Sequence, residues 1–263
     1  MTMLKPVLLV VSFGVCSNEA RTNDIQSIEE AVSRAFPDYE IRRAFTSRTI
    51  IDRIREDEGI AVDTVREALD RLVNEGVREV VIQPTHILPG FEYDELKKTA
   101  SLYAGRFDRL AIGKTLLDSE SDYDEMQRII ADAAKEYSDA DTAVVLMGHG
   151  TEHSANAGYA KLQRRINAAG HNNIFIGTLE AMPTVHYVRA LIRLGDFKRV
   201  VLMPLMIAAG EDAVAQMTGE AEDSWRSIFK DEGFEVECVL KGLGGNADVR
   251  RMMVRHCGET IVG

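Results

Sequence analysis

Val80–Gly90 reads VVIQPTHILPG, and Val200–Gly210, 120 residues further along the chain, reads VVLMPLMIAAG. Each segment is a β-branched apolar run followed by a proline, an apolar turn and a glycine. Leu8–Gly14 (LLVVSFG) and Val144–Gly150 (VVLMGHG) form a second pair of the same kind. Apolar runs of this length are typical of parallel strands that helices cover on both faces. The two pairs therefore predict a repeated α/β unit.

Short apolar runs alternate with longer helical patterns along the whole chain, as in parallel α/β proteins. The predicted strands are Val7–Phe13, Glu40–Phe45, Glu79–Gln83, Thr142–Met147, Asn173–Gly177 and Arg199–Met203. The predicted helices are Glu19–Phe36, Thr64–Asn74, Tyr93–Ala104, Ala155–Ala169, Thr184–Leu194 and Trp225–Lys230. Glu40–Phe45 contains two arginines, which places it at the edge of a sheet.

We therefore predict two similar α/β halves, 1–118 and 139–263, joined by a connection that begins at Asp118–Tyr123. Each half has a mostly parallel sheet flanked by helices, and the halves face a central cleft. Ligands of open α/β sheets bind at the carboxyl ends of the strands. The chemically unusual residues of this chain follow its predicted strands, and the C-terminal half carries the candidate metal site.

The composition narrows the class of protein. The 263 residues carry a formal charge of −11, which gives no basic footprint for nucleic acid or an anionic membrane and favours cationic ligands. The three cysteines have no C-x-x-C spacing, so neither a disulfide framework nor a thiolate zinc site is expected. The apolar stretch near the N-terminus is too short to span a membrane. These features predict a cytoplasmic protein.

Two candidate residues follow predicted strands of the C-terminal half. His149 lies between two glycines, which allow a sharp turn and expose the imidazole, a ligand for borderline metals and a base near neutral pH. Glu180 lies in the loop between a strand and the next helix. Alternatively, His149 caps a turn and Glu180 is a helix-start residue that the helix dipole favours.

The other candidates are weaker when each is taken alone. His86 lies in a loop of prolines and apolar residues that could line a flat apolar ligand, or it could simply pack internally. Asp212 follows a glycine at a strand end, and the 120-residue offset pairs it with Glu92. Both carboxylates could equally start helices. Gly242–Gly245 lacks the Lys-Ser/Thr of a phosphate loop, so no nucleotide is expected.

Taken in order, the strand-end segments resemble the class II tetrapyrrole chelatases, and most closely the anaerobic cobaltochelatases that metallate sirohydrochlorin. The segments span nearly the whole chain. They are VSFG (11–14), AFTS (44–47), PTHILPG (84–90), MGHG (147–150), GTLE (177–180), MPLM (203–206) and DSW (223–225).

The resemblance implies particular roles for several residues. The family's histidine after Met-Gly, a metal ligand and base, falls on His149, and the glutamate of its Thr-Leu-Glu loop falls on Glu180. A second family histidine, in a Gly-Asp-His-Ala context, falls on Asp212, so a carboxylate replaces an imidazole. His149 and Glu180 are then catalytic, and together with Asp212 they bind the metal. Phe13, His86 and Glu92 contact the tetrapyrrole.

The implied function is insertion of a divalent metal into sirohydrochlorin during anaerobic cobalamin synthesis. The metal is a substrate, with cobalt first and nickel or iron as alternatives. Arg43 and Arg48 are candidates for contacts with the anionic tetrapyrrole. The rival hypotheses are a relative that binds tetrapyrrole, haem or metal without catalysis, motivated by Asp212, and an unrelated small-molecule α/β enzyme. Homo-oligomerisation is compatible with the sequence.

Overall fold

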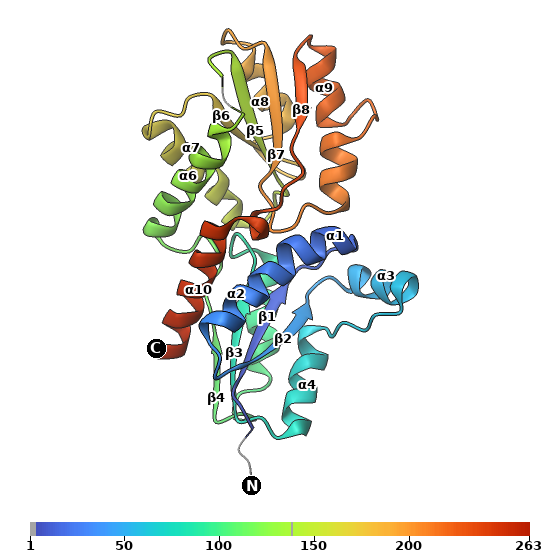
Figure 1. Ribbon diagram of the computed structural model, residues 1–263, viewed down its shortest axis with the longest axis vertical. Helices are drawn as coiled ribbons and strands as arrows, with labels where there is room; N and C mark the ends of the chain where they lie inside the picture. Colours follow the sequence, from blue (N-terminus) through green and yellow to red (C-terminus); the bar gives the residue numbers. More distant parts are fainter. Residues whose placement is uncertain (1–3, 138) are drawn as a thin grey trace. The chain divides into compact units, whose positions relative to one another are not determined.

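The computed structural model describes residues 4–137 and 139–263, which fall into two compact units (Figure 1). The first unit contains the chain up to Asp118 together with Gly244–Gly263, and the second contains Ser119–Leu243. The second unit begins directly after Asp118, so it includes the stretch that we expected to connect the two halves. The structure differs from our expectation at the C-terminus, because the last twenty residues belong to the first unit rather than to the second.

The first unit contains a parallel four-stranded sheet of order β2-β1-β3-β4. Its strands are β1 (Val7–Ser12), β2 (Glu40–Phe45), β3 (Glu79–Pro84) and β4 (Arg109–Ile112). Its helices are α1 (Asn18–Ala20), η1 (Arg21–Gln26), α2 (Ser27–Ala35), α3 (Arg48–Glu58), α4 (Val65–Glu75), α5 (Phe91–Ser101), η4 (Leu243–Gly245) and α10 (Ala247–Val262). The arginine-containing strand β2 lies at the edge, which confirms that prediction.

The second unit repeats this topology, with the order β6-β5-β7-β8 and all neighbours parallel. Its strands are β5 (Thr142–Gly148), β6 (Ile174–Thr178), β7 (Arg199–Pro204) and β8 (Glu235–Cys238). Its helical segments are α6 (Glu120–Lys135), η2 (Ser154–Asn156), α7 (Ala157–Ala168), α8 (Val185–Ile192), η3 (Ala213–Met217) and α9 (Trp225–Asp231). The predicted repeat of two mostly parallel α/β units is therefore confirmed.

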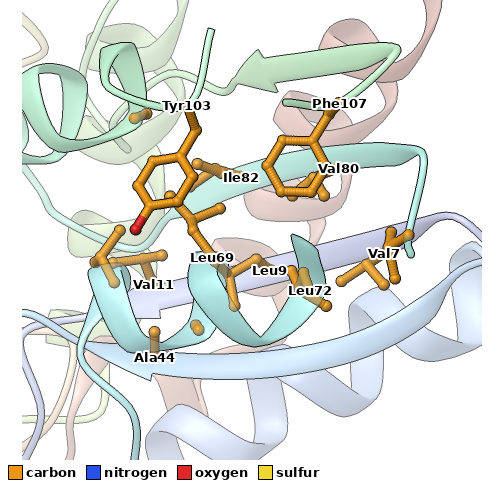
Figure 2. Packing of buried hydrophobic residues seen from close by; sticks show 14 of the residues in the cluster. Val7, Leu9, Val11, Ala44, Leu69, Leu72, Val80, Ile82, Tyr103 and Phe107 are labelled. Atoms are coloured by element: carbon orange, nitrogen blue, oxygen red, sulfur yellow. The ribbon is translucent and has the colours of Figure 1, made fainter. Parts of the chain in front are cut away.

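The core of the first unit explains the continuous apolar run of β1. Val7, Leu9 and Val11 point to one face of the sheet, where Figure 2 shows them packed with Leu69 and Leu72 of α4. Side chains alternate along a strand, so Leu8 and Val10 point to the other face, and they too are fully buried. Both faces are therefore covered, and every position of β1 is apolar or small.

The C-terminal helix α10 belongs to the first unit because its buried face matches that unit. Val249, Met252, Met253 and Cys257 are fully buried, and the helix contacts α2, β3 and β4. The Arg109 guanidinium donates to the carbonyl oxygen of Thr260 at 2.8 Å. The internal repeat did not predict this packing. A division of the chain into two successive halves assigns the last helix to the second half.

The sequence patterns did not predict α3, α6, α10, the short helical segments η3 and η4, or the strands β4 and β8. Helix α3 carries seven charged residues among eleven, and β4 and β8 are four-residue edge strands without a fully buried side chain. Among the described residues, no helix is both long enough and apolar enough to cross a membrane.

Backbone hydrogen bonds hold the loops at the carboxyl edge of each sheet. In the first unit, Thr46 N–H donates to the Ser12 carbonyl oxygen at 2.9 Å and Ser47 N–H to that of Phe13 at 3.1 Å. In the second unit, Leu179 N–H donates to the Gly148 carbonyl at 3.1 Å and Glu180 N–H to that of His149 at 3.0 Å. The two edges therefore share one scaffold, and it fixes the backbone of the candidate residues.

Candidate functional site

His149 lies directly after β5, in a turn that tolerates only glycine on either side. A Cβ atom on Gly148 would lie 2.5 Å from the Tyr159 ring, and one on Gly150 would lie 2.8 Å from Thr178. Gly150 also has a φ of +82°, a conformation that side chains disfavour. The flanking glycines therefore let the chain pass close to Tyr159 and Thr178 while the imidazole stays 45% exposed.

Two carboxylates lie on opposite sides of the His149 ring. Glu180 Oε2 lies 3.5 Å from Nδ1, and Asp212 Oδ2 lies 3.7 Å from Nε2. Both are open to solvent, with exposed side-chain fractions of 60% and 57%. The structure thus brings together three of the predicted residues, from the loops after β5, β6 and β7.

The proton position on His149 follows from a third contact. Nδ1 lies 3.2 Å from the Gly150 carbonyl oxygen. Because a carbonyl oxygen can only accept, this contact places a proton on Nδ1. When Nε2 carries no proton, its lone pair faces the Asp212 carboxylate, so two acceptor atoms lie opposite one another.

A single divalent ion fits between these two acceptors. Ligands each about 2.0–2.2 Å from one ion can be separated by up to about 4.4 Å, and the Nε2–Oδ2 distance is 3.7 Å. Glu180 faces the other ring nitrogen, a position from which outer carboxylates often orient an imidazole at metal sites. Accordingly, the described residues contain no group of three or more His, Cys, Asp or Glu side chains placed to hold one ion.

Neither carboxylate serves as a helix cap, which was the alternative for both. Thr184 caps α8, because its side chain accepts from Tyr187 N–H, and Glu180 lies four residues before it. Asp212 precedes η3 but its side chain makes no capping hydrogen bond. Their side chains are therefore available for another role.

The DSW segment, residues 223–225, packs against β6 of the second sheet. Ser224 caps α9, since its hydroxyl accepts from Ser227 N–H. Trp225 is buried against Gly177 of β6, where a Cβ atom would lie 2.7 Å from the indole ring. The sequence pattern did not identify Tyr159 as the residue that packs against the His149 turn. The two glycines that flank His149 were the signal in the sequence that a bulky side chain lies close to this turn.

The remaining predicted residues, Phe13, His86 and Glu92, lie at the carboxyl edge of the first sheet. Phe13 follows β1 and is 44% exposed. Both ring nitrogens of His86 are buried and have no hydrogen-bond partner within the described residues. Burial lowers the pKa of His86 to about 4, and the nearby Glu92 carboxylate opposes that shift only in part. His86 is therefore a neutral imidazole over most of the pH range.

Two of the three cysteines are unsuited to binding a metal ion. Cys257 is buried, which raises the pKa of its thiol to about 12, and burial also raises the pKa of Cys238. A thiol held protonated is a poor metal ligand. The candidate donors are therefore nitrogen and oxygen.

Comparison with known proteins identifies the family to which these residues belong. The family model described as cobalt chelatase (CbiK) matches residues 6–262. The chain belongs to this family. It is 34% identical to the sirohydrochlorin cobaltochelatase of Salmonella typhimurium over 258 residues, 98% of this chain and 97% of that protein. It is 32% identical over 247 residues to the sirohydrochlorin cobaltochelatase CbiKC of Nitratidesulfovibrio vulgaris, covering 91% and 85% of the two chains.

Solved structures show the same fold at lower sequence identity. SirB from Bacillus subtilis with Fe³⁺ matches with a TM-score of 0.67 at 15% identity, covering 98% of this chain and 96% of that one. CbiX, described as the terminal enzyme of sirohaem biosynthesis in denitrifying bacteria, matches with a TM-score of 0.55 at 18% identity, over 96% and 98% of the chains. The predicted chelatase-like fold and the resemblance to cobaltochelatases are both confirmed.

Proposed function

We propose that this protein inserts a divalent metal ion, cobalt in the first place, into sirohydrochlorin during anaerobic cobalamin synthesis. Membership of the cobalt chelatase family and two relatives named as sirohydrochlorin cobaltochelatases support the proposal. The observation that carries it is the pairing of His149 Nε2 with Asp212 Oδ2 at 3.7 Å. Two facing acceptors at a strand end form a site for a cation.

The metal is captured by His149 and Asp212 while Glu180 holds the ring. The exposed carboxylates attract the hydrated ion, and a proton on Nδ1 leaves Nε2 free to bind it. Two protein ligands leave the other coordination positions to water and to the incoming pyrrole nitrogens. Such partial coordination holds the ion weakly enough for transfer.

Insertion also requires that two pyrrole nitrogens lose their protons. When the ion moves to the macrocycle, the lone pairs of His149 Nε2 and Asp212 become free at the same place. They can accept the two protons, which then pass to solvent because both side chains are exposed. The exchange of one dication for two protons is balanced in charge, and we propose that it needs no nucleotide.

The first unit supplies the contacts for the tetrapyrrole. The exposed Phe13 ring after β1 offers an apolar surface for a flat macrocycle, and His86 remains neutral in the loop after β3. Glu92 lies close enough to His86 to influence its pKa. We propose that these three residues bind the tetrapyrrole rather than the metal.

The carboxylate at position 212 distinguishes this chain from the ligand pattern that the sequence resembles. Carboxylate oxygens suit harder cations than imidazole does. Asp212 therefore shifts the metal preference of the site away from ions that favour nitrogen ligands. We expect Asp212→His to keep or increase cobalt insertion and to favour nickel more than the wild type does.

The test uses purified protein, sirohydrochlorin and cobalt, nickel or ferrous iron, with the absorbance change of metallation as the readout. The rate without protein is subtracted, because free metal reacts slowly with the macrocycle. We expect protein-dependent turnover that is fastest with cobalt. Absence of any protein-dependent rate with all three metals would refute the proposal.

A non-catalytic tetrapyrrole- or metal-binding protein is the second candidate, because Asp212 replaces an imidazole. It predicts stoichiometric binding of sirohydrochlorin or haem without turnover, and the appearance of turnover only in the Asp212→His variant. Multiple turnovers by the wild type would exclude it.

We also propose that the protein acts in the cytoplasm, without nucleic-acid or membrane partners, and we leave self-association open to measurement. The net charge of −11 supports the absence of polyanionic partners. Sedimentation of the purified protein measures the oligomeric state directly.

A further inference from the structure

The two carboxyl edges can be aligned residue by residue through their backbone hydrogen bonds. Ser47 N–H donates to the Phe13 carbonyl as Glu180 N–H donates to that of His149, at 3.1 and 3.0 Å. Ser47 is thus the counterpart of Glu180, and Phe13 that of His149. The first edge carries a hydroxyl and a phenyl ring where the second carries a carboxylate and an imidazole, and Arg48 comes next in the chain.

Positive charge is scarce at both edges. The loops after β5, β6 and β7, residues 149–156, 179–184 and 205–224, contain neither lysine nor arginine. The loop after β3, residues 85–90, contains none either. Two lysines at the ends of these sheets have partners, since Lys114 pairs with Glu259 at 3.2 Å and Lys241 donates to the Tyr137 hydroxyl at 3.1 Å. An anionic ligand therefore has few cations to choose from.

Arg43 and Arg48 both lie near the end of β2, but their surroundings differ. Arg43 is held by Glu29 in a bidentate pair, with nitrogen–oxygen distances of 2.7 and 2.6 Å, and its guanidinium lies 5.9 Å from the centre of the Phe45 ring. Breaking that pair to bind a ligand would sacrifice two charge-assisted hydrogen bonds. Arg43 is consequently a structural residue.

Arg48 is held much more loosely. It is 59% exposed, and its contacts with Asp52 and Glu67 are both 3.4 Å. The other oxygen of Glu67 is committed to Thr64, where it accepts from the backbone N–H and the hydroxyl at 2.8 Å each. The Arg48 guanidinium can therefore exchange these weak contacts for a ligand carboxylate at small cost.

A second observation points to a ligand at this position. Thr46 precedes Arg48 by two residues, and its hydroxyl oxygen is buried with no hydrogen-bond partner within the described residues. Buried hydroxyls normally have a partner. An unsatisfied hydroxyl, an exposed phenyl ring and a loosely held guanidinium thus lie together around the ends of β1 and β2.

We propose that Arg48 binds a carboxylate side chain of the tetrapyrrole and restricts the substrate to macrocycles with acidic side chains. The inference rests on the proposed function, because it takes a tetrapyrrole as the ligand. The planar guanidinium pairs with a carboxylate through two parallel hydrogen bonds. Phe13 contacts the face of the macrocycle, while Arg48 binds a carboxylate at its periphery.

The test compares Arg48→Gln with Arg55→Gln, a matched change at another exposed arginine of α3, and with Arg48→Lys. Cobalt insertion gives KM and kcat for sirohydrochlorin, and equilibrium dialysis gives Kd for metal-free sirohydrochlorin. We expect Arg48→Gln to raise KM and Kd about 2- to 5-fold at low salt, the scale of an exposed charged pair, with kcat unchanged. The increase should shrink at high salt, and Arg48→Lys should recover part of it.

Equal effects of Arg48→Gln and Arg55→Gln, or no change in Kd, would overturn the inference while leaving the proposed function intact. A wild type that binds sirohydrochlorin but never metallates it would refute the proposed function, and Kd would still decide the role of Arg48. A wild type that does not bind sirohydrochlorin would refute both.

Discussion

The carboxyl edges of the two sheets have the same scaffold and different chemistry. The strand orders β2-β1-β3-β4 and β6-β5-β7-β8 are equivalent, and matching hydrogen bonds hold their loops. Phe13 in the first edge corresponds to His149 in the second, and Glu92 corresponds to Asp212. One edge carries an exposed apolar ring and a buried neutral histidine, and the other presents an exposed imidazole between two carboxylates.

We propose that this difference divides one reaction between the two units. The backbone hydrogen bonds match, whereas the side chains at the two edges differ. We propose that the first edge binds the macrocycle and the second binds the metal. This assignment is therefore tested by variants that change the binding of one substrate and leave the binding of the other unchanged.

The largest effect is expected for His149→Ala. Losing the ligand and proton acceptor should lower kcat for cobalt insertion by about 10²- to 10⁴-fold, the usual contribution of a positioned base. His171→Ala, in the turn between α7 and β6, is the matched control and should retain the wild-type rate. Absorbance-monitored insertion measures both rates, and circular dichroism checks the fold. Near-normal turnover by His149→Ala would remove it from the mechanism.

Glu180→Gln should have a smaller effect, because glutamine still offers an oxygen to Nδ1–H but no charge. We expect a loss of about 10- to 100-fold in cobalt affinity or kcat, as for other changes to groups that orient a metal ligand. Glu180→Asp is the companion variant, since it keeps the charge and shortens the reach. If neither substitution changes the cobalt titration or the rate, Glu180 does not orient His149.

His86 should affect stability rather than catalysis as the pH falls. Its pKa is about 4 in the folded chain, against about 6.5 in the unfolded chain, so between these values only the unfolded chain takes up the proton. Stability should therefore fall as the pH drops from about 6.5 to 4, by up to about 3 kcal/mol, with no further loss from this residue below that range.

Proton NMR titration of the histidine ring signals measures this pKa directly, with His86→Asn used for the assignment. Denaturant unfolding of wild type and variant at pH 7 and pH 4.5 measures the linked loss of stability, which the variant should largely lack. A signal for His86 that titrates near 6.5 would contradict the burial of its ring.

The sequence predicted much of this architecture because its strands are apolar on both faces and repeat at a fixed offset. The glycines around His149 also predicted an exposed imidazole at a strand end. The repeat could not predict that α10 packs on the first unit, since its partners α2, β3 and β4 lie far from it in sequence. It could not predict which His149 nitrogen faces which carboxylate either, because that depends on the rotation of one side chain.

Position 92 and position 212 show a further limit of sequence patterns. The 120-residue offset pairs the two carboxylates, and both follow a glycine with the same local hydrogen bonds, Gly90 N–H to Leu88 and Gly210 N–H to Ala208. Only the structure separates them, because Asp212 faces an exposed imidazole and Glu92 lies near a buried one. The imidazole that Asp212 faces follows a different strand, β5, whereas the imidazole near Glu92 follows the same strand, β3.

The division of the two substrates is tested most directly by one pair of titrations on Phe13→Ala and Asp212→Ala. Initial rates of cobalt insertion are measured across cobalt at saturating sirohydrochlorin, and then across sirohydrochlorin at saturating cobalt. We expect Asp212→Ala to raise the cobalt concentration for half-maximal rate about 10-fold or more and to leave the KM for sirohydrochlorin unchanged. Phe13→Ala should do the reverse, with KM for sirohydrochlorin about 10-fold higher and the cobalt dependence unchanged. If Phe13→Ala instead weakened cobalt binding, or Asp212→Ala weakened only sirohydrochlorin binding, the assignment of the two edges would be wrong.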